Sequence, residues 1–418
     1  MSTYKRILIV SNECFSSSSS NGRTLMNFFK DYDKESIAQF FLHGTPDQNI
    51  CSNYFQVTDT DAKNAFLGRK IDKKKKIVSK HSNNKVIRNC RNLLIRDIVW
   101  RSYRWWSKEL DTFISTFNPE CILLQAGDSP FMFHITRRIS KRYFIPIIIY
   151  NSESYVLKEK LYSRVKKNSF FHKLLQYELK GQYKAIMKKA SYCIYSTEAL
   201  EQDYQIKYPH PGKSKSLYVS SSLKPAVVCD KKENDQFHIL YCGNLGVGRA
   251  EIIVKMANVF NEINKNIKFI ICGSFPTDDD LKKASSIPCV DYRGRVSYQE
   301  ALKLMSCCDL LVHCENTNRV DNLYYAFSTK IADCLALGKP FLVYASEKYP
   351  FVQYLHNNKA AYIAQTTEEL NEIINQMLID NDFKNKYINN AILLAKKNHN
   401  IEKNSELMKN IIEFVVKQ

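Results

Sequence analysis

The residues with the clearest chemical potential lie at 328–333, where a polar segment gives way to an apolar one. Apolar residues at helical spacing predict a helix that begins near Ser328 and ends at Gly338. Lys330 would then stand in the first turn, where unpaired backbone N–H groups and the helix dipole favour an anion. We expect an exposed Lys330 side chain with a phosphate as its partner.

Two hydroxyl groups and a carboxylate accompany this lysine. Ser328 and Thr329 can cap the helix or donate to phosphate oxygens, and Asp333 falls on the same helical face as Lys330. A carboxylate beside a cation suits a ligand that carries both phosphates and hydroxyls. The same pattern fits an ordinary capped helix with a solvated lysine, so both interpretations remain open at this point.

The segment STKIADCLALGKP resembles the donor-site signature of retaining, nucleotide-sugar-dependent glycosyltransferases of the GT-B fold, the family 4 type. The resemblance implies that Lys330 holds the donor diphosphate and that Asp333 binds the nucleotide ribose. Better-known members carry two glutamates eight residues apart, and Tyr325 stands at the first of these positions. The sugar contact of that glutamate is not carried over, although Tyr325 remains a donor-side candidate.

A second candidate phosphate site follows a strand-like run at 238–242. Gly243, Asn244 and Gly246 lie between this run and a helix, where glycine lets the backbone approach a phosphate closely. The segment resembles the Gly-Asn-Leu-Gly…Arg loop of the same enzymes, which implies that Arg249 pairs with the donor diphosphate. A glycine-rich turn with one arginine also occurs in many other α/β proteins.

Further donor contacts are implied by the resemblance alone. The segment Asn21–Thr24 resembles the N-terminal glycine-rich loop that faces the donor sugar and diphosphate, which makes Gly22 and Arg23 candidates. Gly273 would lie near the nucleotide. The base would pack against the turn 294–296, which adds Arg295 and Val296.

Two carboxylates follow strand-like runs of the first half, namely Asp128 in the segment 117–129 and Glu153 in the segment 144–155. Strand ends in open α/β sheets direct their loops toward the ligand. We therefore expect Asp128 and Glu153 to meet the acceptor or the reacting sugar and to act in catalysis beside Arg249 and Lys330.

The chain of 418 residues is long enough for two domains. Alternating strand-like and helix-like segments predict an α/β protein, and the resemblance implies GT-B architecture, with two Rossmann-like domains whose parallel sheets face a central cleft. A polar stretch at 205–236 indicates a linker. The expected parts are an acceptor domain at 1–218, a linker at 219–236, a donor domain at 237–400 and a helix at 401–418 that crosses back to the first domain.

The formal charge of +19 is concentrated in two segments. Residues 63–110 carry 15 Lys and Arg against 3 Asp and Glu, and residues 156–189 carry 10 against 2. Basic helices with interleaved aromatics fit an anionic membrane surface. Nucleic acid would attract the same charges, but no nucleic-acid module is recognisable and we expect no such partner. The segments can also be solvated faces that pack Trp100, Trp105 and Trp106 inward.

Several other sites are disfavoured by spacing. None of the 13 cysteines forms a C-x-x-C pair, which favours buried free thiols over disulfides or zinc. The D-x-D sequence at Asp59 and Asp61 abuts a polycationic segment, and we interpret it as a surface loop. We expect no metal and no cofactor. The chain begins directly with a strand-like run, so we expect neither a signal peptide nor a transmembrane anchor.

These features predict a metal-independent glycosyltransferase of the hexosyltransferase type. It would move a sugar from a nucleotide-diphosphate sugar to a glycan or lipid-linked acceptor, with the retention that the resemblance implies. The expected setting is capsule, O-antigen or exopolysaccharide assembly, in the cytoplasm and on the inner face of the cell membrane. The alternatives are a nucleotide-sugar epimerase of the same fold, a non-catalytic nucleotide-sugar binder and a nucleic-acid-binding protein.

Overall fold

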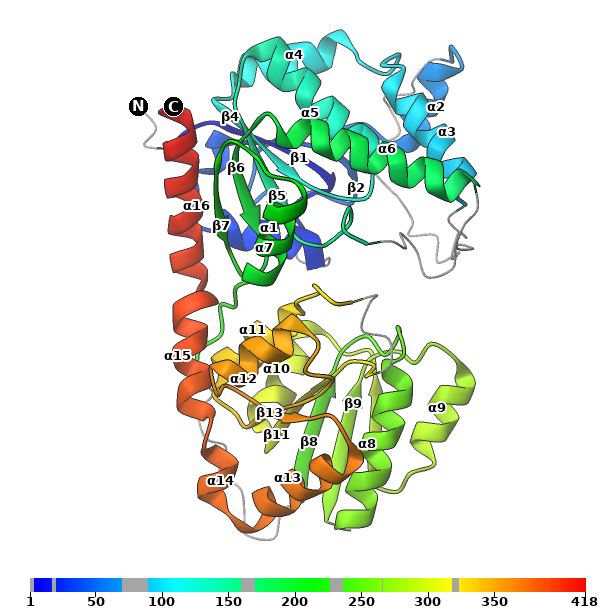
Figure 1. The fold of residues 1–418 in the computed structure, drawn as a ribbon, viewed down its shortest axis with the longest axis vertical. Coiled ribbons are helices and arrows are strands. Elements are labelled where there is room, and N and C mark those ends of the chain that lie inside the picture. The colour runs from blue at the N-terminus through cyan, green and yellow to red at the C-terminus, as the bar shows by residue number, and fades with distance from the viewer. Residues whose placement is uncertain are drawn as a thin grey trace. The chain divides into compact units, whose positions relative to one another are not determined.

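The computed structural model describes residues 4–16, 20–69, 89–158, 170–225, 236–264, 266–317 and 323–418. The chain divides into two compact units. Unit 1 comprises residues 1–218 together with 401–418, and unit 2 comprises residues 219–400. Each unit is built on one parallel sheet with helices packed against it (Figure 1). The expectation of two Rossmann-like α/β domains is confirmed.

Unit 1 holds a seven-stranded sheet in the order β3-β2-β1-β4-β5-β6-β7. Every strand pair in it is parallel. Runs such as ILIV and IIIY form its central strands because branched apolar side chains suit a sheet that is buried on both faces. The strands are β1 (Ile7–Glu13), β2 (Ile37–His43), β3 (Asn53–Gln56), β4 (Cys121–Gln125), β5 (Ile147–Asn151), β6 (Ala190–Tyr195) and β7 (Lys213–Ser216).

The last helix of the chain, α16 (Ile401–Val416), packs within unit 1. Its apolar face is buried with α1, β4 and β6 in one core cluster. Residues of α16 at helical spacing supply this contact, so its amphipathic pattern accounts for the docking. The other helices are α1 (Ser20–Phe28), the short η1 (Lys34–Ser36), α2 (Asp59–Phe66), α3 (Cys90–Arg101), α4 (Lys108–Phe117), α5 (Pro130–Tyr143), α6 (Phe170–Met187) and α7 (Glu198–Lys207).

Unit 2 holds a six-stranded parallel sheet in the order β10-β9-β8-β11-β12-β13. Its apolar side chains alternate between two core clusters, one on each face. The strands are β8 (Phe237–Cys242), β9 (Ile267–Cys272), β10 (Val290–Gly294), β11 (Leu310–Cys314), β12 (Phe341–Tyr344) and β13 (Tyr362–Ala364).

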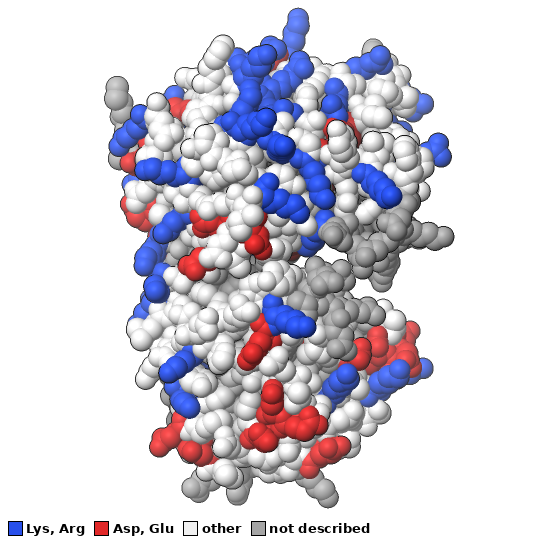
Figure 2. Space-filling view, viewed as in Figure 1, with Lys and Arg blue, Asp and Glu red and all other residues white. Residues whose placement is uncertain are grey.

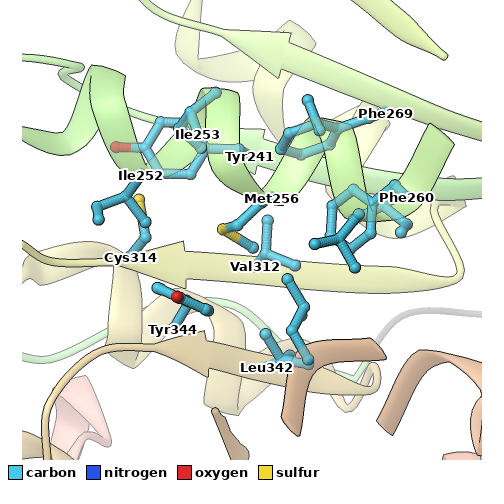
Figure 3. Packing of buried hydrophobic residues seen from close by; sticks show 14 of the residues in the cluster. Tyr241, Ile252, Ile253, Met256, Phe260, Phe269, Val312, Cys314, Leu342 and Tyr344 are labelled. Carbon is cyan, nitrogen blue, oxygen red and sulfur yellow. The ribbon is translucent and has the colours of Figure 1, made fainter. Parts of the chain in front are cut away.

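Helix α8 (Arg249–Ile263) covers one face of this sheet. Its residues Ile252, Ile253, Met256 and Phe260 pack in one cluster with β8, β9, β11 and β12 (Figure 3). This packing fixes the first residue of α8 relative to the strand ends. The remaining helices are α9 (Asp278–Ser285), α10 (Tyr298–Cys307), α11 (Thr329–Leu337), α12 (Pro350–Asn357), α13 (Thr367–Ile379), α14 (Asn381–Asn385) and α15 (Ile388–Asn398).

The polar stretch 205–236, which we interpreted as indicating a linker, is not a linker at its start. Strand β7 lies inside it and pairs in parallel with β6. The sequence KSKS gives no apolar signal because an edge strand can be held by backbone hydrogen bonds while its side chains face solvent. Residues 226–235 of the expected linker lie outside the described residues.

The described parts of the two basic segments are mainly helical and belong to α2, α3, α4 and α6, while residues 70–88 and 159–169 lie outside the described residues. Trp100 and Trp105 are buried in unit 1 and their rings pack edge-on, so the inward-packing interpretation holds for these two side chains. Trp106, which we also expected to pack inward, is only half-buried. Within the described ranges, no helix has the length and apolar character needed to cross a bilayer.

Candidate functional site

The switch point of the sheet in unit 2 lies between β8 and β11, where the strand order reverses. Open α/β sheets bind ligands outside the carboxyl ends of the strands at such a point. Two segments meet there, namely the loop 243–248 after β8 and Glu315, the first residue after β11. The carboxyl ends of β8 and β11 therefore form the candidate functional site.

The loop 243–248 is a tight glycine turn. The backbone N–H of Gly243 donates to the carbonyl oxygen of Cys272 at 2.7 Å, and the N–H of Gly246 donates to Oδ1 of Asn244 at 2.8 Å. Val247 and Gly248 both adopt left-handed backbone angles, with φ of 60° and 85°. This geometry turns the chain sharply from β8 into α8 and places Arg249 at the first position of the helix.

Arg249 forms a side-on ion pair with Glu315. Its Nε donates to Oε2 at 3.0 Å and its Nη2 donates to Oε1 at 2.6 Å. The Nη1 group also donates to the carbonyl oxygen of Asn244 at 3.3 Å. Glu315 is buried and Arg249 is half-buried, with exposed side-chain fractions of 5% for Glu315 and 13% for Arg249. Nε2 of the buried His313 lies 3.3 Å from Oε1 of Glu315.

The pair keeps both groups charged. Burial acts to raise the pKa of the Glu315 carboxyl, but the contact with His313 and the charge of Arg249 outweigh it, and the pKa lies below its usual range. Burial acts to lower the pKa of Arg249, and the Glu315 carboxylate more than offsets this. The pKa of His313 is lowered, first by burial. It follows that His313 is neutral and lies beside an ionised Arg249–Glu315 pair.

Lys330 reaches the same loop from the first turn of α11. A Cβ atom added to Gly243 would lie 1.7 Å from its Nζ, so the ammonium group occupies the space that glycine leaves open. The Nζ also lies 5.3 Å from the centre of the Tyr241 ring. Burial first, and then the positive charge of Arg249, lower the pKa of Lys330. Two cations distant in sequence are thus brought close together.

The expected helix start is confirmed, but the expected exposure of Lys330 is wrong. Ser328 is the N-cap of α11, and Gly338 ends the helix with a φ of 64°. The side chain of Lys330 is half-buried because it folds back over β8 instead of extending into solvent. That fold-back depends on a glycine far away in the sequence.

Asp333 lies on the buried side of α11. Its Oδ1 accepts a hydrogen bond from the Ser221 hydroxyl at 2.6 Å. Ser221 itself is held by a backbone bond from its N–H to the carbonyl oxygen of His399. Asp333 therefore ties the first described residues of unit 2 to α11, a structural contact that the sequence does not predict.

The other donor-side candidates of unit 2 lie in neighbouring loops. A Cβ on Gly273 would lie 1.9 Å from the carbonyl oxygen of Gly243, so only glycine fits there. Nε of the exposed Arg295 donates to Oγ of Ser274 at 2.6 Å. Val296 is half-buried against the core of unit 2.

Three candidates precede or open α11. Ser328 makes no side-chain hydrogen bond to the helix N-terminus, although it occupies the N-cap position. Thr329 is the first residue of the helix. The Tyr325 ring packs edge-on against Tyr324, with 4.7 Å between ring centres.

The candidates of the first half all lie in unit 1. Gly22 and Arg23 are in the first turn of α1. Asp128 follows β4 and its Oδ1 lies 3.4 Å from Oγ of Ser129. Glu153 follows β5 and forms an ion pair with Lys158, with 2.7 Å between Oε2 and Nζ. These positions are at the carboxyl ends of parallel strands or the helix starts that follow them, as expected.

The D-x-D residues lie in a helix, not in the surface loop that we expected. Asp61 completes a capping box with Thr58 at the start of α2. Asp59 accepts hydrogen bonds from Arg96 at 2.7 Å and from Trp100 at 2.8 Å. Both carboxylates therefore have structural partners. Within the described ranges, no group of three His, Cys, Asp or Glu side chains is arranged to hold a metal ion.

Glu315 and His313 are site residues that the sequence does not single out. A carboxylate directly after a buried strand is the available signal, and it is the same signal that selects Asp128 and Glu153. The partner of Glu315 is 66 residues away, and only the pairing of β8 with β11 brings them together.

Residues 230–393 match the family model of glycosyl transferases group 1. No curated protein sequence matches the chain. The structure of Anabaena Alr3699/HepE in complex with UDP has a TM-score of 0.65 at 12% sequence identity, and the alignment covers 98% of this chain and 99% of that chain. The fold is GT-B. The GT-B likeness extends to sucrose-phosphate synthase from Thermosynechococcus elongatus, with a TM-score of 0.63, 12% identity and coverage of 98% and 99%.

A third GT-B structure, WaaG, is a glycosyltransferase involved in lipopolysaccharide biosynthesis. It has a TM-score of 0.56 at 12% identity, with coverage of 97% of this chain and 99% of that chain. The matched family segment contains Arg249, Glu315 and Lys330, so the cluster at the switch point lies inside it.

Proposed function

We propose that this chain transfers a sugar from a nucleotide-diphosphate sugar to a glycan or lipid-linked acceptor. The observation that carries the proposal is the meeting of Arg249 and Lys330 at the switch point of unit 2. Two half-buried or buried cations beside a glycine turn form a favourable place for a diphosphate. The family match over 230–393 and the UDP bound to a GT-B neighbour support it.

In the proposed reaction, the bond between the anomeric carbon and the diphosphate oxygen breaks while an acceptor hydroxyl bonds to that carbon and gives its proton to the departing diphosphate. Negative charge builds on the departing diphosphate, and Arg249 and Lys330 stabilise it without a metal ion. Asp333 orients the ribose while it keeps its contact with Ser221. Asp128 and Glu153 act on the acceptor side.

The finer parts of the proposal rest on the resemblance and on the neighbours. Retention at the anomeric carbon belongs to the enzymes that the STKIADCLALGKP segment resembles. Capsule, O-antigen or exopolysaccharide assembly is supported by the likeness to WaaG. We place the protein in the cytoplasm, at the inner face of the cell membrane.

Thermal unfolding with a panel of uridine, guanosine, adenosine and cytidine diphosphate sugars tests the donor site. We expect one nucleotide class to raise the unfolding temperature, since a ligand that binds only the folded state stabilises it. The stabilisation should persist in EDTA and should be lost in Lys330→Met. No shift with any donor contradicts the proposal, and a strict requirement for manganese contradicts its metal-free form.

A membrane surface is the second part of the proposal, and its residues lie on α3 and α6. Large apolar side chains are exposed on these two packed helices, with Tyr177 exposed by 77% and Ile98 by 61%. Figure 2 shows Lys and Arg side chains gathered over the neighbouring part of unit 1. Cations beside exposed apolar side chains suit an anionic lipid surface. The exposed apolar residues are Ile95, Ile98, Phe170, Phe171, Leu174 and Tyr177.

Binding to liposomes should rise with the anionic lipid content and fall with salt, because exposed charges are screened within about 10 Å at 0.1 M salt. The double variant Ile98→Ser/Tyr177→Ser should bind at least about tenfold more weakly, since each apolar side chain contributes on burial. Ile379→Ser is the matched control, because Ile379 is 87% exposed on α13 of unit 2. Equal binding to neutral vesicles, or binding unaffected by the double variant, argues against this surface.

A further inference from the structure

Glu315 is a buried carboxylate that pairs with Arg249 and has no role of its own in the proposed reaction. It follows β11 directly, and its backbone N–H donates to the carbonyl oxygen of Tyr344 at 3.1 Å. Its carboxylate is therefore anchored to the sheet, while Arg249 stands at the first position of a helix after a left-handed turn.

The contacts of Arg249 divide its hydrogen-bond donors into two sets. A guanidinium has five N–H groups. Glu315 takes Nε–H and one N–H of Nη2, and the Asn244 carbonyl oxygen takes one N–H of Nη1. Among the described residues, this leaves one N–H on Nη1 and one on Nη2. These two groups form the end of the planar fork, the edge that matches a phosphate.

We propose that Glu315 is a positioning residue, which holds the side edge of Arg249 so that its end edge is presented to the donor diphosphate. The inference rests on the proposed function of unit 2. A long arginine side chain loses conformational freedom when it binds a ligand, and an anchored carboxylate has already removed that freedom. Positioning of this kind should strengthen donor binding although Glu315 is itself an anion.

A simple electrostatic view makes the opposite prediction. In that view the Glu315 carboxylate competes with the diphosphate for Arg249, and removal of its charge should tighten binding. The two views therefore differ in the sign of the effect. Glu315→Gln separates them, because it removes the charge and keeps the size of the side chain.

The test is calorimetric titration of the full chain with inorganic pyrophosphate and with the four nucleoside diphosphates UDP, GDP, ADP and CDP. For the nucleotide that binds the wild type, we expect Glu315→Gln to raise Kd about 10- to 100-fold, the range of a lost charge-assisted hydrogen-bond pair. In an Arg249→Ala background, the same change should have no further effect on Kd. In turnover assays, KM for the donor should rise more than kcat falls.

Controls separate positioning from folding. Asp309→Asn removes a carboxylate at the opposite end of β11, where Asp309 accepts from the backbone N–H of His238 at 2.7 Å. It should lower the unfolding temperature without changing Kd. Glu315→Asp keeps the charge but shortens the side chain, and we expect an intermediate Kd.

Three outcomes overturn the inference. They are an unchanged Kd in Glu315→Gln, a lower Kd in that variant, and an equal effect of Glu315→Gln with and without Arg249. If the wild type binds none of the probes, the result contradicts the proposed function, and the positioning role of Glu315 is then wrong as well.

Discussion

Replacing Lys330 by methionine should lower kcat by about two to three orders of magnitude, the usual cost of removing one preorganised donor from a developing negative charge. Methionine keeps an unbranched stem over β8 and Tyr241 but removes the ammonium group that lies against Gly243. Steady-state kinetics with the donor found by thermal unfolding measures the effect. The loss should appear with every acceptor, because the charge develops on the donor.

Lys330→Ala is the companion variant. It removes the stem as well, and the half-buried position means that some stability is lost along with activity. A comparison of the unfolding temperatures of the Ala and Met variants separates packing from charge. Turnover near the wild-type rate in Lys330→Met would remove the ammonium group from the mechanism.

Gly243→Ala should reduce donor turnover nearly as much as Lys330→Met, although it changes no charge. The added Cβ would lie 1.7 Å from Nζ of Lys330, and a flexible lysine end moves more easily than the backbone of β8. The ammonium group should therefore leave its place while the fold persists. Steady-state kinetics gives the loss of turnover, and thermal unfolding shows whether the fold is retained.

Gly246→Ala provides the graded comparison in the same loop. Its Cβ would meet Oδ1 of Asn244 at 3.1 Å, a contact that a small shift relieves, so we expect a much smaller loss. Equal losses in Gly243→Ala and Gly246→Ala would mean that the loop tolerates no side chain at all. The specific displacement of Lys330 would then be wrong.

Gly243 and Gly246 illustrate that a sequence pattern predicts the position of a loop but not the side chains that the loop contacts. A glycine after a strand signals close backbone approach, and the signal is the same for Gly243 and Gly246. Only in the folded protein does Gly243 face the ammonium group of Lys330 and Gly246 the amide oxygen of Asn244. Trp100 and Trp105 are a second example, because they lie in a strongly basic segment and are nevertheless buried in the hydrophobic core.

The sequence by itself determined the local features of this protein. Apolar runs specified the central strands, and Gly338 specified the end of α11, because backbone preference and side-chain periodicity act over a few residues. The motif segments around Lys330 and Arg249 were likewise recognisable from the sequence. They sufficed to predict two α/β domains and a site for a phosphate.

Only the tertiary structure decided how these segments combine. The Arg249–Glu315 pair and the burial of Lys330 against Gly243 join residues that are far apart in the chain. The contact of Asp333 with Ser221 does the same. Such contacts depend on which strands become neighbours, and strand order follows from the packing of the whole sheet with its helices. No local pattern encodes that order, so the cluster at the switch point emerges only when β8 and β11 pair.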